Sequence, residues 1–577
     1  MSHTTVASLG THEPRIRARL ARFTQERTIE RLWERDPSLW VENDAARRSV
    51  ENRLGWLDAP ERAARDRGAY EALAQAARDQ GFRHTLLLGM GGSSLCPEVL
   101  RRSFAQAAGF LSLAVLDSTD PAAVLAAERE SPLTRTLFLV STKSGTTVET
   151  LSFYRYFWQV VEAAAHTGGG RSFVAVTDPG TPLASEAGSA GFRAVVPAPP
   201  DVGGRYSALT PFGLVPAALL GMDLAKLVAR AQAMAERCRQ PGEDNPGLFL
   251  GAALCELGLT GRDKITVIVD PPLSSFGLWL EQLLAESLGK RGKGLIPVCE
   301  AALGPPASYG DDRVFVYLGM DGGRPEIERR LAALEAAGHP VLRLPLDDAY
   351  DVGGEFFRWE VATAVIAHGL GVSAFDEPNV SESKENTQAV LDSLQKEGKL
   401  ARETPWARGG GIELYGPPGS SPPGQGTGGE RELIRHFETW LAARSAGSYL
   451  ALQAYLPPLA PLEDAIEAAK LRFRDRTRLA VTAGFGPRFL HSTGQLHKGG
   501  PPKGAFLQVT ADSPAELAIP GAPYTFEALI RAQALGDARS LAGRSLPFLR
   551  LHFPDGAETG AVRARLERLS SGAGASV

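Results

Sequence analysis

The segment Thr85–Ser94, TLLLGMGGSS, runs an apolar stretch directly into a loop of small and hydroxyl residues. The segment Thr136–Thr147, TLFLVSTKSGTT, repeats this layout. Each pattern predicts a buried strand, then a loop, then the start of a helix. Loops of this kind leave backbone N–H groups unpaired, and those groups bind anions such as phosphate. Neither loop has the spacing of a nucleotide-binding motif, so we expect a small phosphorylated metabolite instead.

Apolar stretches and helical patterns alternate on both sides of these loops, in two successive blocks. Residues 81–225 contain TLLLG, LAVLD, TLFLVS, FVAVTD and FRAVVPAP, and residues 226–402 contain KITVIVD, RVFVYLGM and PVLRLPL. This alternation predicts the α/β class, with two doubly wound parallel sheets covered by helices. Ligands of such sheets bind beyond the carboxyl ends of the strands, where both loops begin.

Three further regions flank these two domains. Residues 1–80 have apolar side chains at helical spacing and predict a helical N-terminal arm. Residues 403–430 are rich in Gly, Pro and Ser, which predicts a flexible linker. Residues 431–577 predict a third, divergent α/β module. Its SYLALQAYLPP echoes ITVIVDPPL of the second domain, which suggests an internal duplication.

The overall composition is that of an ordinary globular protein of 577 residues, 44% hydrophobic and 22% charged, with a net charge of -4. This balance argues against nucleic acid or an acidic membrane as a partner. The four cysteines are scattered, so neither a metal site nor a disulfide framework is expected. No signal peptide and no apolar run of membrane-spanning length is visible, and we expect a cytoplasmic protein.

Six motifs occur together in this chain: GMGGSSLCP, STKSGTTVET, VGGRYSALTPFGL, QLLAESLGK, FDEPNVSESK and LHSTGQ. Together they resemble the glucose-6-phosphate isomerase family, whose fold contains two sugar-isomerase domains. One motif is displaced, because in the family LHSTGQ precedes the FDEPNVSESK segment, whereas here it follows the linker. The layout is similar to the isomerase half of bacterial fusions with transaldolase. No barrel-sized segment precedes residue 80, so we expect only the isomerase, and whether a transaldolase activity is associated stays open.

The resemblance implies roles for individual residues. The residues implied to hold the substrate phosphate are Gly92, Ser93, Thr142, Lys143, Ser144, Gly145, Thr146 and Thr147. Gly204 and Gln282 would also contact the substrate. Arg205 would stabilise the negative charge of an enediolate. Glu286, on an apolar helix, would be the base that moves a proton between two sugar carbons.

Ring opening is implied for two more residues, Lys384 and His491. An imidazole titrates near neutrality and suits this proton transfer. His497 lies close in sequence and stays an alternative to His491. Glu377 occupies the place of the family's usual Gln, and its role is left open.

The resemblance implies reversible conversion of glucose 6-phosphate to fructose 6-phosphate through a cis-enediolate, as in glycolysis and gluconeogenesis, with no cofactor and no metal. Two alternatives stay open: a sugar-phosphate-binding regulator without catalysis, and an isomerase for another sugar phosphate such as mannose 6-phosphate. In family dimers, the resemblance implies, the histidine comes from the neighbouring subunit. We therefore expect either a monomer whose third module replaces that subunit, or a homodimer.

Overall fold

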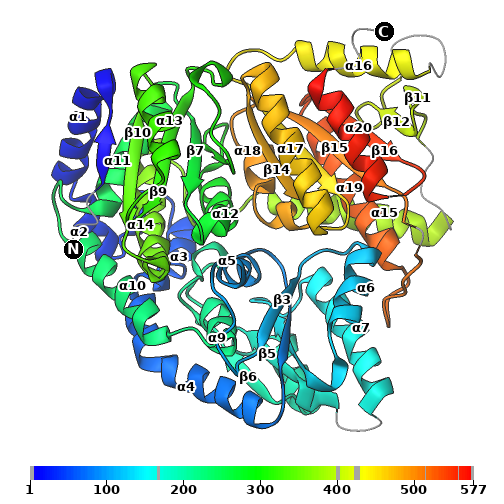
Figure 1. Ribbon diagram of the computed structural model, residues 1–577. Helices are drawn as coiled ribbons and strands as arrows, with labels where there is room; N and C mark the ends of the chain where they lie inside the picture. The colour runs from blue at the N-terminus through cyan, green and yellow to red at the C-terminus, as the bar shows by residue number, and fades with distance from the viewer. Residues whose placement is uncertain are drawn as a thin grey trace. The chain divides into compact units, whose positions relative to one another are not determined.

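The computed structural model describes residues 5–165, 169–397, 403–421, 429–513, 515–556 and 558–572. The chain divides into two compact units. The first comprises Met1–Asp117, Ala127–Ala301 and Arg313–Glu377, and the second comprises Ser118–Ala126, Ala302–Asp312 and Pro378–Val577. Figure 1 shows their helices and strands.

The first sheet confirms the five strands expected in residues 81–225. They are β2 (His84–Gly89), β3 (Ser112–Leu116), β4 (Thr136–Ser141), β5 (Phe173–Thr177) and β6 (Ala194–Pro197). All are parallel, in the order β3-β2-β4-β5-β6. The helices of this region are α5 (Leu95–Ser103), α6 (Pro121–Glu130), α7 (Val148–Ala165), α8 (Pro182–Ser189) and α9 (Pro211–Leu220). The central strands β2 and β4 are buried along nearly their whole length, as their continuous apolar runs predict.

The second sheet has the order β1-β10-β9-β7-β8. Its parallel strands are β7 (Lys264–Val269), β8 (Ile296–Cys299), β9 (Arg313–Met320) and β10 (Val341–Leu346). β1 (Val6–Ser8) pairs antiparallel with β10, so the first described residues belong to this sheet rather than to a purely helical arm. The helices here are α10 (Leu224–Arg239), α11 (Pro246–Leu259), α12 (Phe276–Leu288), α13 (Pro325–Ala336) and α14 (Val352–Leu370).

Four helices of the N-terminal region bury their apolar faces in the core of the first unit. They are α1 (Glu13–Gln25), α2 (Thr28–Trp33), α3 (Asp44–Glu51) and α4 (Ala59–Asp79). Leu20, Phe23, Ile29 and Leu32 each keep only 1% of their surface exposed. The helical spacing of these residues therefore reflects packing in the same core that holds both sheets.

The second unit has its own sheet and core. β13 (Tyr449–Tyr455), β14 (Ala480–Phe485), β15 (Gly504–Ala511) and β16 (Phe548–Phe553) are parallel, in the order β16-β15-β13-β14. The helices are α15 (Val380–Glu397), α16 (Glu430–Ala442), α17 (Ala460–Thr477), α18 (Gly494–Gly499), α19 (Phe526–Ala542) and α20 (Thr559–Ser571). This order matches that of the second sheet strand for strand, with an antiparallel strand added at the same edge in each.

The prediction of a linker over residues 403–430 is wrong in part. β11 (Ala407–Gly409) and β12 (Ile412–Tyr415) form a hairpin, and β12 pairs antiparallel with β16. Gly410 and Gly411 join the strands with φ of 58° and 73°, the left-handed pair that a tight hairpin turn requires. Composition hid this hairpin because the same glycines also characterise linkers. Residues 422–428 of the predicted linker lie outside the described residues.

Candidate active site

The two Gly/Ser/Thr loops begin side by side at one edge of the first sheet. β2 and β4 are neighbours, and Gly89 lies opposite Ser141 at their carboxyl ends. The first loop continues into a short turn at Gly91–Ser93 and then α5, and the second precedes α7. The Ser141 hydroxyl donates a hydrogen bond to the Ser93 carbonyl over 3.2 Å. The expected pair of anion-binding loops is thus held together as one structure.

The second loop is organised by its own hydroxyl groups. The Thr142 and Thr147 hydroxyls are hydrogen-bonded at 2.9 Å, and the Thr146 N–H donates to Ser144 Oγ over 3.3 Å. Gly145 has φ of 65°, a left-handed conformation in which a side chain would also press on Thr181. Hydrogen bonds between residues of the loop itself therefore hold its conformation.

The Lys143 side chain leaves this loop. Its ammonium group pairs with the Asp178 carboxylate and donates to the Pro200 carbonyl over 3.2 Å. The Asp178 carboxylate therefore already neutralises this charge. The main-chain N–H is the part of Lys143 that remains in the loop.

The first loop packs directly on the turn that carries Arg205, a 3-10 turn at Gly204–Tyr206. A Cβ atom on Gly92 would lie 2.1 Å from the Gly204 carbonyl oxygen, so a side chain has no room there. The Ser207 hydroxyl closes the turn by donating to the same oxygen over 2.6 Å. The first loop and the turn that carries Arg205 are thereby fixed to one another through backbone contact.

Arg205 is buried, with 4% of its surface exposed. Nε donates to Ser287 Oγ (3.0 Å) and to the Ala374 carbonyl (3.3 Å). Nη2 donates to the carbonyls of Ala374 (2.7 Å) and Asp376 (2.9 Å). Because two of its nitrogens are anchored this way, the direction of the third is set by the fold.

That third nitrogen, Nη1 of Arg205, faces two carboxylates. Glu286 Oε1 lies 3.3 Å away, and Nη1 donates to Glu377 Oε2 over 3.0 Å. Glu286 sits near the end of α12, and its other oxygen accepts from Gln282 Nε2 at 3.1 Å, one turn earlier. The structure therefore brings Glu286, Arg205, Gln282 and Glu377 together, and the first three are residues that the sequence singled out.

The pKa of Glu286 is raised. Burial is the largest cause, and the charge of Glu377 adds to it, while Arg205, Gln282 and Lys290 oppose it. Only 13% of the Glu286 side chain is exposed. A carboxylate with a raised pKa is a stronger base than an ordinary one, which suits proton abstraction from carbon.

Lys290 is a buried residue of the site that the sequence analysis did not single out. Its Nζ donates to the Ser373 carbonyl (2.5 Å) and pairs with Asp376 Oδ1 (2.8 Å). Burial first, and Arg205 second, lower its pKa to about 8. Its place in AESLGK, four residues after Glu286, was a signal that it shares the end of α12 with the predicted base.

Lys384 and His491 belong to the second unit. Lys384 is exposed on α15, and His491 is half-buried at the end of a short 3-10 turn, Arg488–His491. Their segments are joined within this unit, because Asn379 N–H donates to Gln495 Oε1 (2.9 Å) and Gln495 Nε2 donates to Asn379 Oδ1 (2.8 Å). Two motifs that the linker separates in sequence thus meet in the fold.

A second tie joins the same two motifs. Arg544 forms a bidentate pair with Glu382 of α15 (2.6 and 2.5 Å), and its Nε donates to the Lys498 carbonyl over 2.8 Å. His497 is buried beside Lys498, and burial lowers its pKa to about 3. His497 contacts Gln453 at 3.4 Å. It is therefore a neutral core histidine near pH 7.

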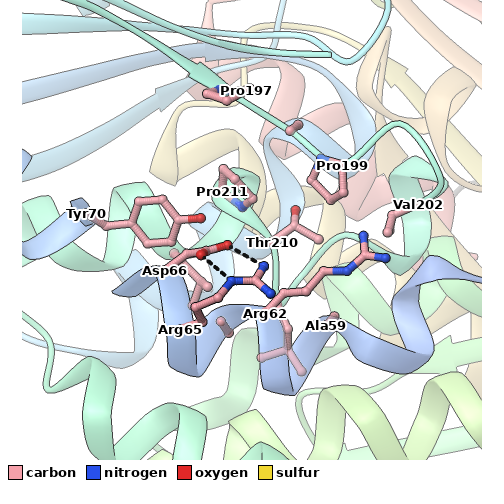
Figure 2. Close-up of a pocket in the computed structure, with 14 residues that line it drawn as sticks. Ala59, Arg62, Arg65, Asp66, Tyr70, Pro197, Pro199, Val202, Thr210 and Pro211 are labelled. Carbon is pink, nitrogen blue, oxygen red and sulfur yellow. Dashed lines mark hydrogen bonds and ion pairs between the residues drawn. The ribbon is translucent and has the colours of Figure 1, made fainter. Parts of the chain in front are cut away.

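A pocket of ≈ 280 Å³ lies in the first unit. Figure 2 shows Arg62 and Tyr70 of α4 facing Pro199, Val202 and Thr210 across it. None of the predicted site residues lines it. The stretch Pro197–Val202 on its wall leads directly into the Arg205 turn. Arg62 holds that stretch through a bidentate pair with Asp201, with both N–O distances at 2.8 Å.

Within the described ranges, no group of three or more His, Cys, Asp or Glu residues is arranged to hold a metal ion. Every helix in those same ranges is too short or too polar to cross a membrane.

Comparisons with known proteins identify the family of the chain. The family model for phosphoglucose isomerase matches residues 71–296, which include both loops, Arg205 and Glu286. A glucose-6-phosphate isomerase of Rubrobacter xylanophilus is 30% identical over 367 residues, covering 55% of this chain and 85% of that protein. One from Symbiobacterium thermophilum is 31% identical, covering 60% of this chain and 88% of that protein.

A solved structure shares the fold. It is a hypothetical protein of Thermus thermophilus, with a TM-score of 0.57 and 27% identity, covering 67% of this chain and 99% of that one. The family match and the two relatives, which are covered over most of their length, agree on the family. This chain belongs to the phosphoglucose isomerase family of enzymes.

Proposed function

We propose that the chain catalyses the reversible isomerisation of glucose 6-phosphate and fructose 6-phosphate. The observation that carries this proposal is the juxtaposition of Glu286 and Arg205, 3.3 Å apart and linked by backbone packing to two anion-binding loops. The relatives named as glucose-6-phosphate isomerases support the choice of substrate.

In the proposed reaction the ionised carboxylate of Glu286 takes a proton from C2 of the open-chain aldose. The electron pair of that C–H bond forms a double bond between C1 and C2, and the C1 carbonyl oxygen gains negative charge. Nη1 of Arg205 stabilises this enediolate through charge and hydrogen bonding. Glu286 then returns the proton to C1 while the proton of the O2 hydroxyl passes to O1. The C2–O bond thereby becomes the carbonyl of the ketose, without net loss or gain of atoms.

The loops at Ser93 and Thr142–Thr147 would hold the phosphate of the substrate. Their hydroxyls and main-chain N–H groups lie at helix starts, where the helix dipole also favours an anion. Holding the far end of the sugar phosphate would orient C1 and C2 toward Glu286 and lower the entropic cost of the reaction. Gly204 and Gln282 would complete the contact with the sugar.

Lys384 and His491 are proposed to open the sugar ring. His491 is favoured over His497 because His497 is fully buried with a pKa of about 3, so it cannot accept and release protons near neutral pH. Substituting His491→Ala should slow conversion of the cyclic substrate, and His497→Ala should act mainly on stability.

The test of the base is a coupled assay of fructose 6-phosphate conversion on wild type and Glu286→Gln. The amide keeps the size of the side chain but cannot take a proton, so activity should fall by at least about 100-fold. Glu281→Gln, on the same helix, is the matched control. Equal activity of wild type and Glu286→Gln would refute the assignment. Mannose 6-phosphate, assayed in parallel, tests substrate preference.

We also propose that the third module stands in for a partner subunit, so that one chain supplies both Glu286 and His491. The matching strand order of the second and third sheets supports a duplicated domain. PPL follows the first parallel strand of each sheet, at Pro271–Leu273 after β7 and at Pro457–Leu459 after β13. Light scattering should give a monomer. An obligate dimer in which Glu286→Gln and His491→Ala chains restore activity on mixing would contradict this proposal.

A further inference from the structure

Two carboxylates, those of Glu286 and Glu377, contact Arg205. The role of Glu377 was left open by the sequence. Two nitrogens of Arg205 are committed to a hydroxyl and to backbone carbonyls. Only Nη1 faces Glu377 and Glu286, and the two contacts differ. Glu377 accepts a hydrogen bond at 3.0 Å, whereas Glu286 forms an ion pair at 3.3 Å.

Glu377 is held in this position by the segment that precedes it. The carbonyls of Ala374 and Asp376 accept from Arg205, and the Ser373 carbonyl accepts from Lys290. The segment is therefore fastened on both sides to buried cations. Glu377 directly follows this anchored segment, which therefore places its carboxylate at Nη1 of Arg205.

The charges around Nη1 explain why the two carboxylates behave differently. One guanidinium cannot neutralise two ionised carboxylates, and the excess negative charge is most costly where burial is deepest. Glu286 has 13% of its side chain exposed and Glu377 has 40%. Burial tends to raise the pKa of Glu377, but the charge and hydrogen bond of Arg205 lower it overall. Glu286 consequently takes the raised pKa of the pair.

We propose that Glu377 is a positioning residue that occupies Nη1 of Arg205 and so prevents a tight ion pair between Arg205 and Glu286. Glu286 then remains a strong base while Arg205 stays beside the reacting carbons. The proposal rests on the function proposed above, in which Glu286 carries the proton. A neutral side chain at position 377 would leave the whole charge of Arg205 to Glu286.

Other groups also face Glu286 and enter its titration. Those that contribute to its charge environment are Arg205, Glu377, Gln282, Lys290 and Tyr206. Arg53 acts on Glu377 in turn. Nη1 of Arg205 pairs with Glu286 itself and with Glu377, so removing the charge of Glu377 leaves Nη1 to Glu286 and changes the balance in one direction.

The test is the pH profile of kcat/KM for wild type, Glu377→Gln and Glu377→Asp. The base must be ionised to act, so activity falls as pH drops through the pKa of Glu286. Glu377→Gln removes a repelling charge, and the acid limb should move down by about one pH unit. Because a less basic carboxylate abstracts protons more slowly, kcat on the plateau should fall several-fold. Glu377→Asp retains the charge and should keep the limb near its wild-type position.

Each outcome separates this inference from the function on which it rests. An acid limb that is the same in Glu377→Gln and wild type, with Glu286→Gln inactive, would overturn the role of Glu377 and leave the isomerase proposal standing. Activity that persists in Glu286→Gln would overturn both. A shifted limb in Glu377→Gln with an unshifted limb in Glu377→Asp would support the charge-based role. The phosphate of the substrate titrates equally in all three proteins, so it cancels in the comparison.

Discussion

Gly92→Ala tests whether the first loop, which contains Gly91–Ser93, and the Arg205 turn act as one structure. A Cβ at position 92 would lie 2.1 Å from the Gly204 oxygen and 2.4 Å from its carbonyl carbon. Carbon–oxygen contacts in proteins lie near ~3.3 Å or beyond, so the two turns must separate by about 1 Å. Both contacting atoms belong to the backbone, and a rotamer change cannot relieve the clash.

A displacement of this size should cost about 100-fold in kcat/KM, because reacting groups need alignment on that scale. The loss should include kcat, since Arg205 moves with its turn, and not KM alone. Overpacking should also lower the free energy of unfolding by roughly 1–3 kcal/mol. The assays are steady-state kinetics with fructose 6-phosphate and urea denaturation.

Gly203→Ala is the matched control for this substitution. Gly203 has φ of -70°, and a Cβ there would meet nothing within 4 Å. It should therefore keep near wild-type kinetics. A Gly92→Ala protein with wild-type kcat, or one affected only in KM, would refute the reasoning that the loop and the Arg205 turn are coupled through this contact.

Three more perturbations follow from the contacts of the first unit. Glu360 is fully buried, its oxygens have no hydrogen-bond partner among the described residues, and burial raises its pKa. Its folded-state pKa lies above the unfolded value, so the free energy of unfolding should decline as pH rises from about 4.5. Glu360→Gln should reduce this decline, measured by urea denaturation at about pH 5 and pH 8. An equal decline in wild type and Glu360→Gln would contradict the prediction. Arg62→Ala should release Pro197–Val202, the stretch before the Arg205 turn, and lower kcat more than it raises KM. Arg65→Ala is the control. Equal effects of the two substitutions would argue against a role for the ion pair between Arg62 and Asp201. Lys143→Ala should raise KM only a few-fold, since Asp178 already neutralises the ammonium group. A rise in KM as large as about 100-fold would show that the ammonium group binds the substrate directly.

Long apolar runs that end in glycine or hydroxyl residues were readable without a structure. β2 and β4 follow that rule, and β7 and β9 are similar apolar runs with other endings, because a strand buried on both faces must be apolar throughout. Some short or edge strands were not predicted, although the edge strands β3 and β6 of the first sheet were. β8 has four residues, and β1 and the β11–β12 hairpin depend on a partner strand for their stability rather than on their own composition.

Within the candidate site, residue identity was predictable but mutual arrangement was not. The motif around Arg205 and the apolar helix around Glu286 stood out by residue type. The hydrogen bonds from Arg205 to Ala374, Asp376 and Glu377 did not, because carbonyl acceptors carry no sequence signature and Glu377 lies far along the chain.

The sequence by itself determined the α/β class, the two loops at strand ends and the buried helix that carries Glu286, since each depends on local periodicity and residue type. Tertiary structure alone decided that the Glu377 carboxylate reaches Arg205 and that Asn379 pairs with Gln495. It also decided that the third sheet repeats the strand order of the second. These features arise where chain segments distant in sequence pack together, and their energies depend on burial and distance, which only the folded chain fixes.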